Sequence, residues 1–186
     1  MNYNQILKEG ENFLKKSNIK SPNLDTELIL SKIINKKREE ILLNSKNKLK
    51  NTDLKKFKSY LLRRYHKEPM AYILGYKHFW KHKFLTNKSV LIPRPDTELI
   101  VEETLKHLPI DKSKKILDVG TGSGCIVVSL IKERPKCAAT AIDISRKALN
   151  VAKTNAKLHQ LENKINFINI DIDKYKSYNY DLIISN

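Results

Sequence analysis

The segment from Ile116 to Cys125 constrains the fold of this chain more than any other. It reads Ile-Leu-Asp-Val-Gly-Thr-Gly-Ser-Gly-Cys and is followed by the largely apolar run 126–131. A short apolar strand, a turn with glycines at alternate positions and a buried helix form the start of an α/β unit. Glycine is needed in such a turn because its backbone angles disfavour a Cβ atom and because a ligand lies against bare backbone. We therefore predict an α/β fold with a ligand at this turn.

The residues around the glycines narrow the choice of ligand. A phosphate-binding loop would need Gly-Lys-Ser/Thr after the glycines, and the dinucleotide fingerprint would place its third glycine at Cys125. Instead Asp118 precedes Gly120, and Asp143 ends the next apolar run about 20 residues later, as expected for an acid that binds ribose hydroxyls. An acid before the glycines repels a pyrophosphate, whereas S-adenosylmethionine (SAM) carries an ammonium and a sulfonium. We predict SAM as the cofactor; the alternative is a purely structural turn.

Further strands are predicted after the glycine turn. They cover Ala138–Ile142, Ile165–Ile172 and Tyr180–Asn186, and Ser145 caps the helix that follows the first of them. Strands separated by helices form a parallel sheet, and ligands bind at the carboxyl ends of its strands. The residues predicted at these ends are Asp118 with Gly120, Asp143, Asp171 and Asn186. We expect them to converge on one rim of the sheet.

The first 75 residues predict a small helical domain. Helical patterns cover Asn2–Ser17, a helix starting at Ser21-Pro22, a short helix at Ile41–Leu43, and a helix that Thr52 caps and Pro69 closes. No catalytic residue types are grouped on these helices, so their apolar stripes are packing surfaces. A domain of this kind is typical of docking to a macromolecular partner.

Residues 76–93 predict a β-hairpin that links the helical part to the α/β part. Aromatic and β-branched residues appear there, and Asn87-Lys88 is the expected turn between the two strands. His78 and His82 would share a face of the hairpin, but no third metal ligand is near them in the sequence, so no metal site is predicted. The predicted domains are 1–75, 76–93 and 94–186.

The formal net charge of +16 suggests a nucleic-acid partner or a compositional bias. Only six of the 36 basic residues are arginine, and the lysines are spread along the whole chain. Lysine, asparagine and isoleucine are all encoded by A- and T-rich codons. We therefore favour compositional bias over direct nucleic-acid binding as the cause of the charge.

Cysteine content and hydropathy indicate the compartment. The chain has two cysteines, too few and wrongly spaced for a disulfide framework or a metal cluster. Its N-terminus opens polar and amphipathic, and no apolar run reaches membrane-spanning length. We expect a cytoplasmic protein without a membrane partner.

Four segments of the chain resemble the release-factor glutamine methyltransferases, the PrmC/HemK family. They are Glu-Pro-Met-Ala-Tyr-Ile-Leu-Gly at 68–75, Leu-Ile-Pro-Arg-Pro-Asp-Thr-Glu at 91–98, Asp-Val-Gly-Thr-Gly-Ser-Gly at 118–124 and Asp-Leu-Ile-Ile-Ser-Asn at 181–186. The glycine segment is shared by many SAM-dependent enzymes, whereas the first two are far more specific. The resemblance implies a helical substrate-docking domain before a Rossmann-like SAM-dependent methyltransferase domain.

The resemblance also implies an activity and its residues. The methyl group of SAM would pass to the side-chain amide nitrogen of the glutamine in the Gly-Gly-Gln motif of peptide chain release factors. Asn186 would accept a hydrogen bond from that amide, as both the catalytic and the substrate-binding residue. The cofactor-binding residues implied are Gly120, Thr121, Gly122, Ser123, Gly124, Asp143, Asp171, Ile172 and Asn186.

The sequence ends at Asn186, the first residue of the family's Asn-Pro-Pro-Tyr motif. The resemblance therefore implies a C-terminally truncated chain, which we expect to be inactive alone. Two alternatives stay open: an adenine-amino methyltransferase acting on RNA or DNA, and a non-catalytic SAM-binding remnant of a broken gene. The charge slightly favours the first alternative, whereas the Pro-Arg-Pro-Asp-Thr-Glu stretch and the helical leader favour a protein substrate.

Overall fold

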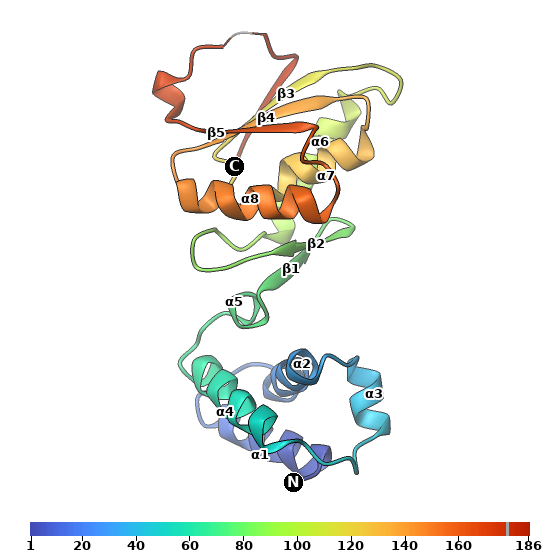
Figure 1. Cartoon of the computed structure of the whole chain (residues 1–186), viewed down its shortest axis with the longest axis vertical. Helices are drawn as coiled ribbons and strands as arrows, with labels where there is room; N and C mark the ends of the chain where they lie inside the picture. Colours follow the sequence, from blue (N-terminus) through green and yellow to red (C-terminus); the bar gives the residue numbers. More distant parts are fainter. Residues whose placement is uncertain (178) are drawn as a thin grey trace. The chain divides into compact units, whose positions relative to one another are not determined.

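The protein consists of two compact units, Met1–Leu74 and Gly75–Asn186. The computed structural model describes residues 1–177 and 179–186 (Figure 1). Each unit buries its own cluster of apolar side chains. Among the described residues, no helix combines the length and apolar composition needed to cross a bilayer.

The first unit is helical, as predicted. Its helices are α1 (Tyr3–Lys15), α2 (Pro22–Ile34), α3 (Arg38–Leu43), α4 (Asn51–Tyr65) and α5 (Met70–Leu74). Asn2 and Gln5 form a reciprocal capping box at the start of α1, which satisfies two backbone N–H groups that the helix leaves without partners.

Two of the predicted helix caps are wrong. Helix α4 starts at Asn51 with Lys50 in the capping position, so Thr52 lies inside its first turn instead of capping it. Ser21 precedes α2, but its side chain makes no capping hydrogen bond; Pro22 occupies the first turn as predicted. Proline fits there because the missing N–H would have no partner within the helix.

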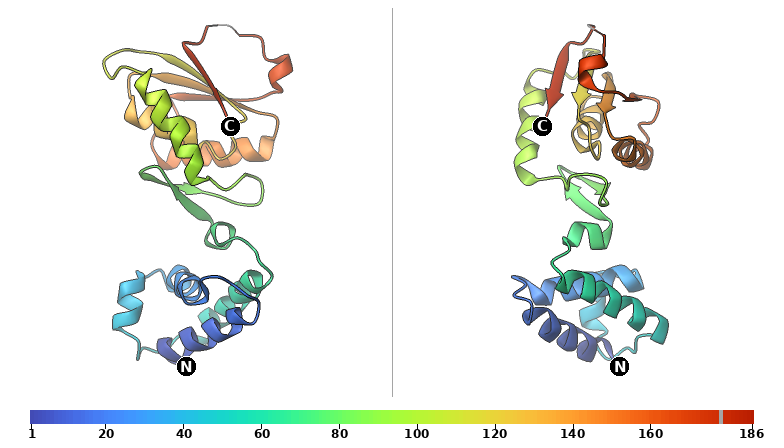
Figure 2. Two further views of the ribbon diagram at one scale, coloured as in Figure 1. Left: turned by 180° about the vertical axis from the view of Figure 1, so that it is seen from behind. Right: turned by 90° about the vertical axis from the view of Figure 1, so that its left-hand side faces the viewer.

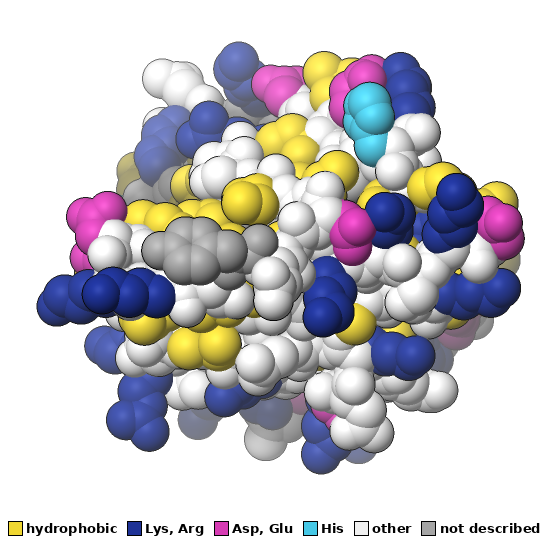
Figure 3. Space-filling view, turned by 90° about the horizontal axis from the view of Figure 1, so that it is seen from above, with side chains coloured by type: hydrophobic (Ala, Val, Ile, Leu, Met, Phe, Trp, Pro, Cys, Tyr) yellow, Lys and Arg dark blue, Asp and Glu magenta, His cyan; other side chains and the backbone are white. Residues whose placement is uncertain are grey.

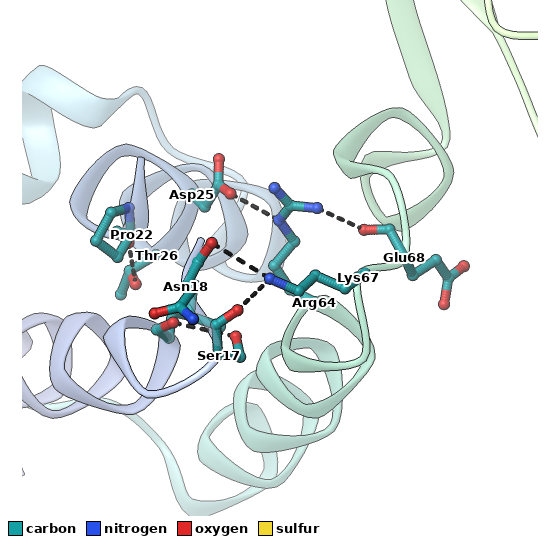
Figure 4. A network of polar contacts seen from close by, with 9 residues as sticks. Ser17, Asn18, Pro22, Asp25, Thr26, Arg64, Lys67 and Glu68 are labelled. Carbon is teal, nitrogen blue, oxygen red and sulfur yellow. Dashed lines mark hydrogen bonds and ion pairs between the residues drawn. The ribbon is translucent and has the colours of Figure 1, made fainter. Parts of the chain in front are cut away.

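A polar network in the first unit joins α2 and α4 to the segment that follows α4 (Figure 4). Arg64 Nε donates to Asp25 Oδ2 at 2.7 Å, and Arg64 Nη1 donates to the Glu68 carbonyl at 3.0 Å. Lys67 Nζ donates to the carbonyls of Ser17 and Asn18, just beyond the end of α1. The arginine and the lysine thus fix the end of α4 and the residues after it to α2 and to the segment that follows α1.

The second unit opens with a β-hairpin that is shorter than predicted. Strand β1 (Tyr76–Phe79) pairs antiparallel with β2 (His82–Leu85), so the turn lies at Trp80–Lys81 and not at Asn87–Lys88. Residues 86–93 form no strand. Trp80 has a φ of +54°, and its N–H donates to Glu98 Oε1 at 2.7 Å. Contact with a residue 18 positions away therefore stabilises a turn that lacks the usual turn residues.

A four-stranded parallel sheet forms the centre of the second unit, which confirms the predicted α/β class. Its order is β5 (Ile165–Asn169), β4 (Ala138–Asp143), β3 (Lys115–Val119) and β6 (Leu182–Ser185). Helices α7 (Cys125–Glu133) and α8 (Arg146–Leu158) cross between the first three strands on one face (Figure 1). The chain then reverses direction across the sheet to place β6 beside β3. Ligands bind at the carboxyl ends of strands next to such a reversal.

Most predicted elements that follow the hairpin are confirmed, but one predicted strand is too long. Ser145 caps α8 by accepting a hydrogen bond from the Ala148 N–H, as predicted. The third strand ends at Asn169 and not at Ile172. Asp171 instead precedes the short 3-10 helix η2 (Ile172–Lys174) and accepts a hydrogen bond from the Asp173 N–H. It therefore occupies a loop beyond the strand.

Ser129 is an unsatisfied polar group in the core of this unit. It lies inside α7, is fully buried, and its Oγ has no hydrogen-bond partner among the described residues. A buried hydroxyl without a partner destabilises the folded state, and alanine is the better helix former. Ser129→Ala should therefore raise the free energy of unfolding by about 1 kcal/mol, measured by urea unfolding with Trp80 fluorescence. A lower stability would mean that the hydroxyl is hydrogen-bonded.

Candidate functional site

Three glycines shape the loop between β3 and α7. Gly120, Gly122 and Gly124 have φ angles of +71°, +55° and +78°, a region that L side chains rarely adopt. The N–H groups of Gly120 and Thr121 donate to the Ile142 carbonyl at 2.9 and 3.0 Å, and the Gly124 N–H donates to the Thr121 carbonyl at 2.8 Å. These N–H groups are engaged within the protein. This loop therefore differs from one whose N–H groups point at a phosphate.

The surroundings of the glycines divide the loop into an open part and a packed part. A Cβ atom on Gly120 would meet no heavy atom within 4 Å, and one on Gly122 would meet only the Gly120 carbonyl oxygen at 3.9 Å. A Cβ on Gly124 would lie 3.2 Å from the Cβ of Ala152 in α8. The first two glycines thus face open space, whereas the third packs the loop onto α8.

A pocket of about 180 Å³ lies at the carboxyl ends of β3 and β4 and beyond the end of β5. Four predicted cofactor residues line it, namely Gly120, Asp143, Asp171 and Ile172. The other lining residues are Val119, Ile142, Ile144 and Ile170. The pocket therefore combines apolar walls with two carboxylates. The predicted residues Thr121, Gly122, Ser123, Gly124 and Asn186 are not part of its lining.

Asp143 joins the end of β4 to the glycine loop. Its Oδ2 accepts a hydrogen bond from the Gly122 N–H at 2.9 Å, and its Oδ1 accepts one from the Ser145 N–H at 2.8 Å. An ionised carboxylate has about four acceptor positions, so each oxygen has capacity for a further donor. Asp143 can therefore support the loop and accept hydrogen bonds from ligand hydroxyls at the same time.

Asp118 is buried behind the loop. Its exposed fraction is 1%, and Thr121 Oγ1 donates to its Oδ2 at 2.7 Å. Burial raises the pKa of the Asp118 carboxyl to about 6; the Thr121 hydrogen bond opposes the rise, and the charge of Asp143 adds to it. In this structure Asp118 supports the loop through its hydrogen bond with Thr121.

The raised pKa of Asp118 predicts a pH-dependent stability. The folded protein keeps this proton up to about pH 6, whereas the unfolded chain releases it near pH 4. Stability from this group is therefore greatest below pH 4 and is lost as the pH rises to about 6. Asp118→Asn removes the cost of the buried charge and should stabilise the protein above pH 6 by about 1–3 kcal/mol.

Urea unfolding from pH 4 to pH 8 measures this difference, with exposed Asp111→Asn as the control. The gain of Asp118→Asn over the natural protein should grow between pH 4 and pH 6 and then stay constant. A gain that is the same at every pH would contradict the assignment.

Asn186 lies at the carboxyl end of β6, apart from the pocket lining. Its Nδ2 donates to Thr97 Oγ1 at 2.8 Å. Thr97 is buried and ends the 3-10 helix η1 (Pro95–Thr97), which leads into α6 (Glu98–Lys106). Both views in Figure 2 accordingly place the end of the chain beside α6. The segment 91–98 thus reaches the predicted catalytic residue.

Two asparagines near the site were missed in the sequence. Asn155 of α8 is fully buried and contacts both β2 and the glycine loop, and Asn169 Nδ2 donates to the carbonyls of Asp143 and Ile144 at 2.9 Å each. Asn169 could have been noticed as a polar residue ending a strand. Asn155 carries only a weak signal, a polar residue on the apolar side of a predicted helix.

In Figure 3, Lys and Arg side chains are distributed across the face shown, with Asp and Glu side chains among them. Within residues 1–177 and 179–186, no three His, Cys, Asp or Glu side chains are grouped as a metal site would require. His82 lies beside His159, with ring centroids 5.4 Å apart.

Two family models match successive parts of the chain. The model described as PrmC N-terminal domain matches residues 5–75, and the model described as methyltransferase small domain matches residues 97–186. The two matches correspond to the helical unit and to most of the α/β unit.

Curated relatives align across both parts. A release factor glutamine methyltransferase of Coxiella burnetii is 42% identical over 77% of this chain and 52% of its own length. One from Buchnera aphidicola is 38% identical over 95% of this chain and 65% of its own length. A bifunctional methyltransferase of Rickettsia typhi is 35% identical over 98% of this chain and 39% of its own length. The chain thus spans less than two thirds of each relative. Both parts of the chain thus match the release factor glutamine methyltransferases, known as the PrmC/HemK family.

Proposed function

We propose that this protein transfers a methyl group from SAM to the side-chain amide nitrogen of the glutamine in the Gly-Gly-Gln motif of peptide chain release factors. The observation that carries the proposal is the match of a PrmC N-terminal domain ahead of a methyltransferase domain in one chain. Relatives named release factor glutamine methyltransferase support the same substrate. A cytoplasmic location is part of the proposal.

The residues around the pocket fit SAM. Gly120 leaves open space in front of its backbone, which a ligand can approach closely. Asp143 has acceptor capacity for ribose hydroxyls, and the isoleucines at the ends of β4 and β5 offer apolar surface to an adenine ring. The N–H groups of Gly120, Thr121, Gly122 and Gly124 are engaged within the protein, and SAM has no phosphate that would need them.

SAM supplies an electrophilic methyl group when it is bound, and the chain supplies position. An amide nitrogen is a poor nucleophile because its lone pair is delocalised into the carbonyl. We assign Asn186 Oδ1 to accept a hydrogen bond from the substrate NH2 group, which orients the lone pair and stabilises the charge that develops on nitrogen. Thr97 engages Asn186 Nδ2 and so holds the amide in the orientation that presents Oδ1. S-adenosylhomocysteine leaves as the C–N bond forms, and the methylated amide, which is strongly acidic while its nitrogen is protonated, then loses a proton to water.

Two measurements test the proposal. Calorimetry on the 186-residue chain should detect binding of S-adenosylhomocysteine. For transfer, the longest protein that the gene encodes receives labelled SAM with a release factor and RNA side by side, and Asn186→Ala serves as the control. Label on the Gly-Gly-Gln glutamine of the release factor is expected. Label only in RNA would identify an adenine-amino methyltransferase, and binding without transfer to either would leave a non-catalytic SAM-binding protein.

A further inference from the structure

A single buried side chain connects the β-hairpin to the glycine loop. Asn155 Oδ1 accepts a hydrogen bond from the Leu85 N–H at 2.7 Å. Its Nδ2 donates to the Leu85 carbonyl at 3.0 Å and to the Ser123 carbonyl at 2.8 Å. Leu85 ends strand β2, and Ser123 lies between two glycines of the loop. Asn155 itself is fully buried in α8.

Asparagine matches these three backbone groups. Its amide offers two N–H donors and one carbonyl acceptor, and the contacts use both donors and the acceptor. The N–H and carbonyl of Leu85 point away from strand β1, because the next N–H, that of Thr86, bonds back to Gly75. Asn155 thus occupies the position that a neighbouring strand would take beside β2.

The same face of α8 holds the glycine loop at a second point. Gly124 packs against Ala152, which precedes Asn155 by three residues and so lies one turn earlier in the helix. The Gly122 N–H of the same loop donates a hydrogen bond to Asp143. The hydrogen bond from Asn155 to the Ser123 carbonyl therefore helps to fix the conformation in which the loop faces the pocket.

We propose that Asn155 is a positioning residue that couples the hairpin to the cofactor loop, so that cofactor binding stabilises strands β1 and β2. The inference rests on the proposed SAM site. A ligand that orders the loop fixes the Ser123 carbonyl, and with it the amide that pairs with Leu85. Coupling between two sites is reciprocal, so an ordered hairpin favours cofactor binding to the same extent.

Amide hydrogen exchange, read by mass spectrometry with and without saturating S-adenosylhomocysteine, tests the proposal. In the natural protein the ligand should slow exchange in the loop 120–124 and in the hairpin 76–85, each by at least about fivefold. In Asn155→Asp the carboxylate still accepts from the Leu85 N–H but cannot donate to either carbonyl. The ligand should then slow exchange in the loop alone.

Two variants serve as controls. Thr154→Ala changes the adjacent, exposed position in α8, and Ile165→Val removes buried volume from the same core. Both should keep the ligand effect on the hairpin, which separates coupling from a general loss of stability.

The outcomes distinguish the coupling from the cofactor site. Slowing confined to the loop of the natural protein would overturn the coupling and leave the SAM site standing. An unchanged hairpin response in Asn155→Asp would also overturn it. Slowing in neither segment would overturn the SAM site and the coupling together. If Asn155→Asp fails to fold, the exchange of the natural protein with and without the ligand still decides whether cofactor binding affects the hairpin.

Discussion

Replacing Arg64 with alanine should lower the free energy of unfolding of the unit Met1–Leu74 by about 3–5 kcal/mol. The guanidinium donates to Asp25, whose side chain is 8% exposed, and also to the Glu68 carbonyl. Removing it leaves a buried carboxylate without its partner, which costs far more than the intact pair contributes. The same change removes the hydrogen bond from Arg64 to the Glu68 carbonyl, which holds the backbone after α4.

Urea unfolding measures this loss of stability, with hydrogen exchange of the amides in α1 and α2 as the readout. These amides report on this unit alone. Lys15→Ala is the control, because Lys15 forms an exposed ion pair with Glu11 that is worth only about 0.3–0.5 kcal/mol. The double variant Arg64→Ala with Asp25→Ala should lose less than the two single changes together. A loss no larger than that of Lys15→Ala would mean that water replaces the guanidinium at no cost.

The parts of the fold that were predictable from the sequence depend on local patterns. The glycine loop, the strand before it and the cap at Ser145 each follow from residues within a few positions of one another. Glycine at positive φ and serine before a helix have strong local causes, so their neighbours alone identify them. The parallel sheet then follows because short strands alternate with helices.

Features that depend on distant contacts were not predictable. The hairpin turns at Trp80, where no glycine or asparagine indicates a turn, because Glu98 accepts the Trp80 N–H. The sequence pattern favours Asn87-Lys88 instead, since those residues are common in turns. Likewise, Asp171 lies beyond the end of β5 because the strand stops pairing at Asn169, whereas the apolar pattern continues to Ile172.

In the candidate site too, some features follow from local sequence patterns and others depend on contacts between distant residues. Gly120, Asp143, Asp171 and Ile172 line one pocket, as expected for residues that follow parallel strands. Thr121 and Ser123 have structural contacts instead, one with Asp118 and the other with Asn155. These partners lie on different elements, and only the packed fold brings Asn155 to the loop.

Asp143→Ala should weaken the binding of S-adenosylhomocysteine by about 1.5–3 kcal/mol, a roughly 10- to 150-fold increase in Kd. The carboxylate is the group in the pocket that we assign to the ribose hydroxyls, and hydrogen bonds to a charged group are worth about this much. The change also removes the acceptor for the Gly122 and Ser145 N–H groups, which loosens the loop.

Calorimetry gives Kd for the natural protein and three variants, each measured well below its unfolding temperature. Asp143→Asn keeps one acceptor oxygen, so its loss should be intermediate. Asp173→Ala removes an exposed carboxylate two residues from Asp171 and outside the pocket lining, so its Kd should match that of the natural protein. Equal weakening by Asp173→Ala and Asp143→Ala would indicate a general effect of charge. An unchanged Kd for Asp143→Ala would exclude this residue from the ribose site and leave the pocket with Asp171 as its one remaining carboxylate.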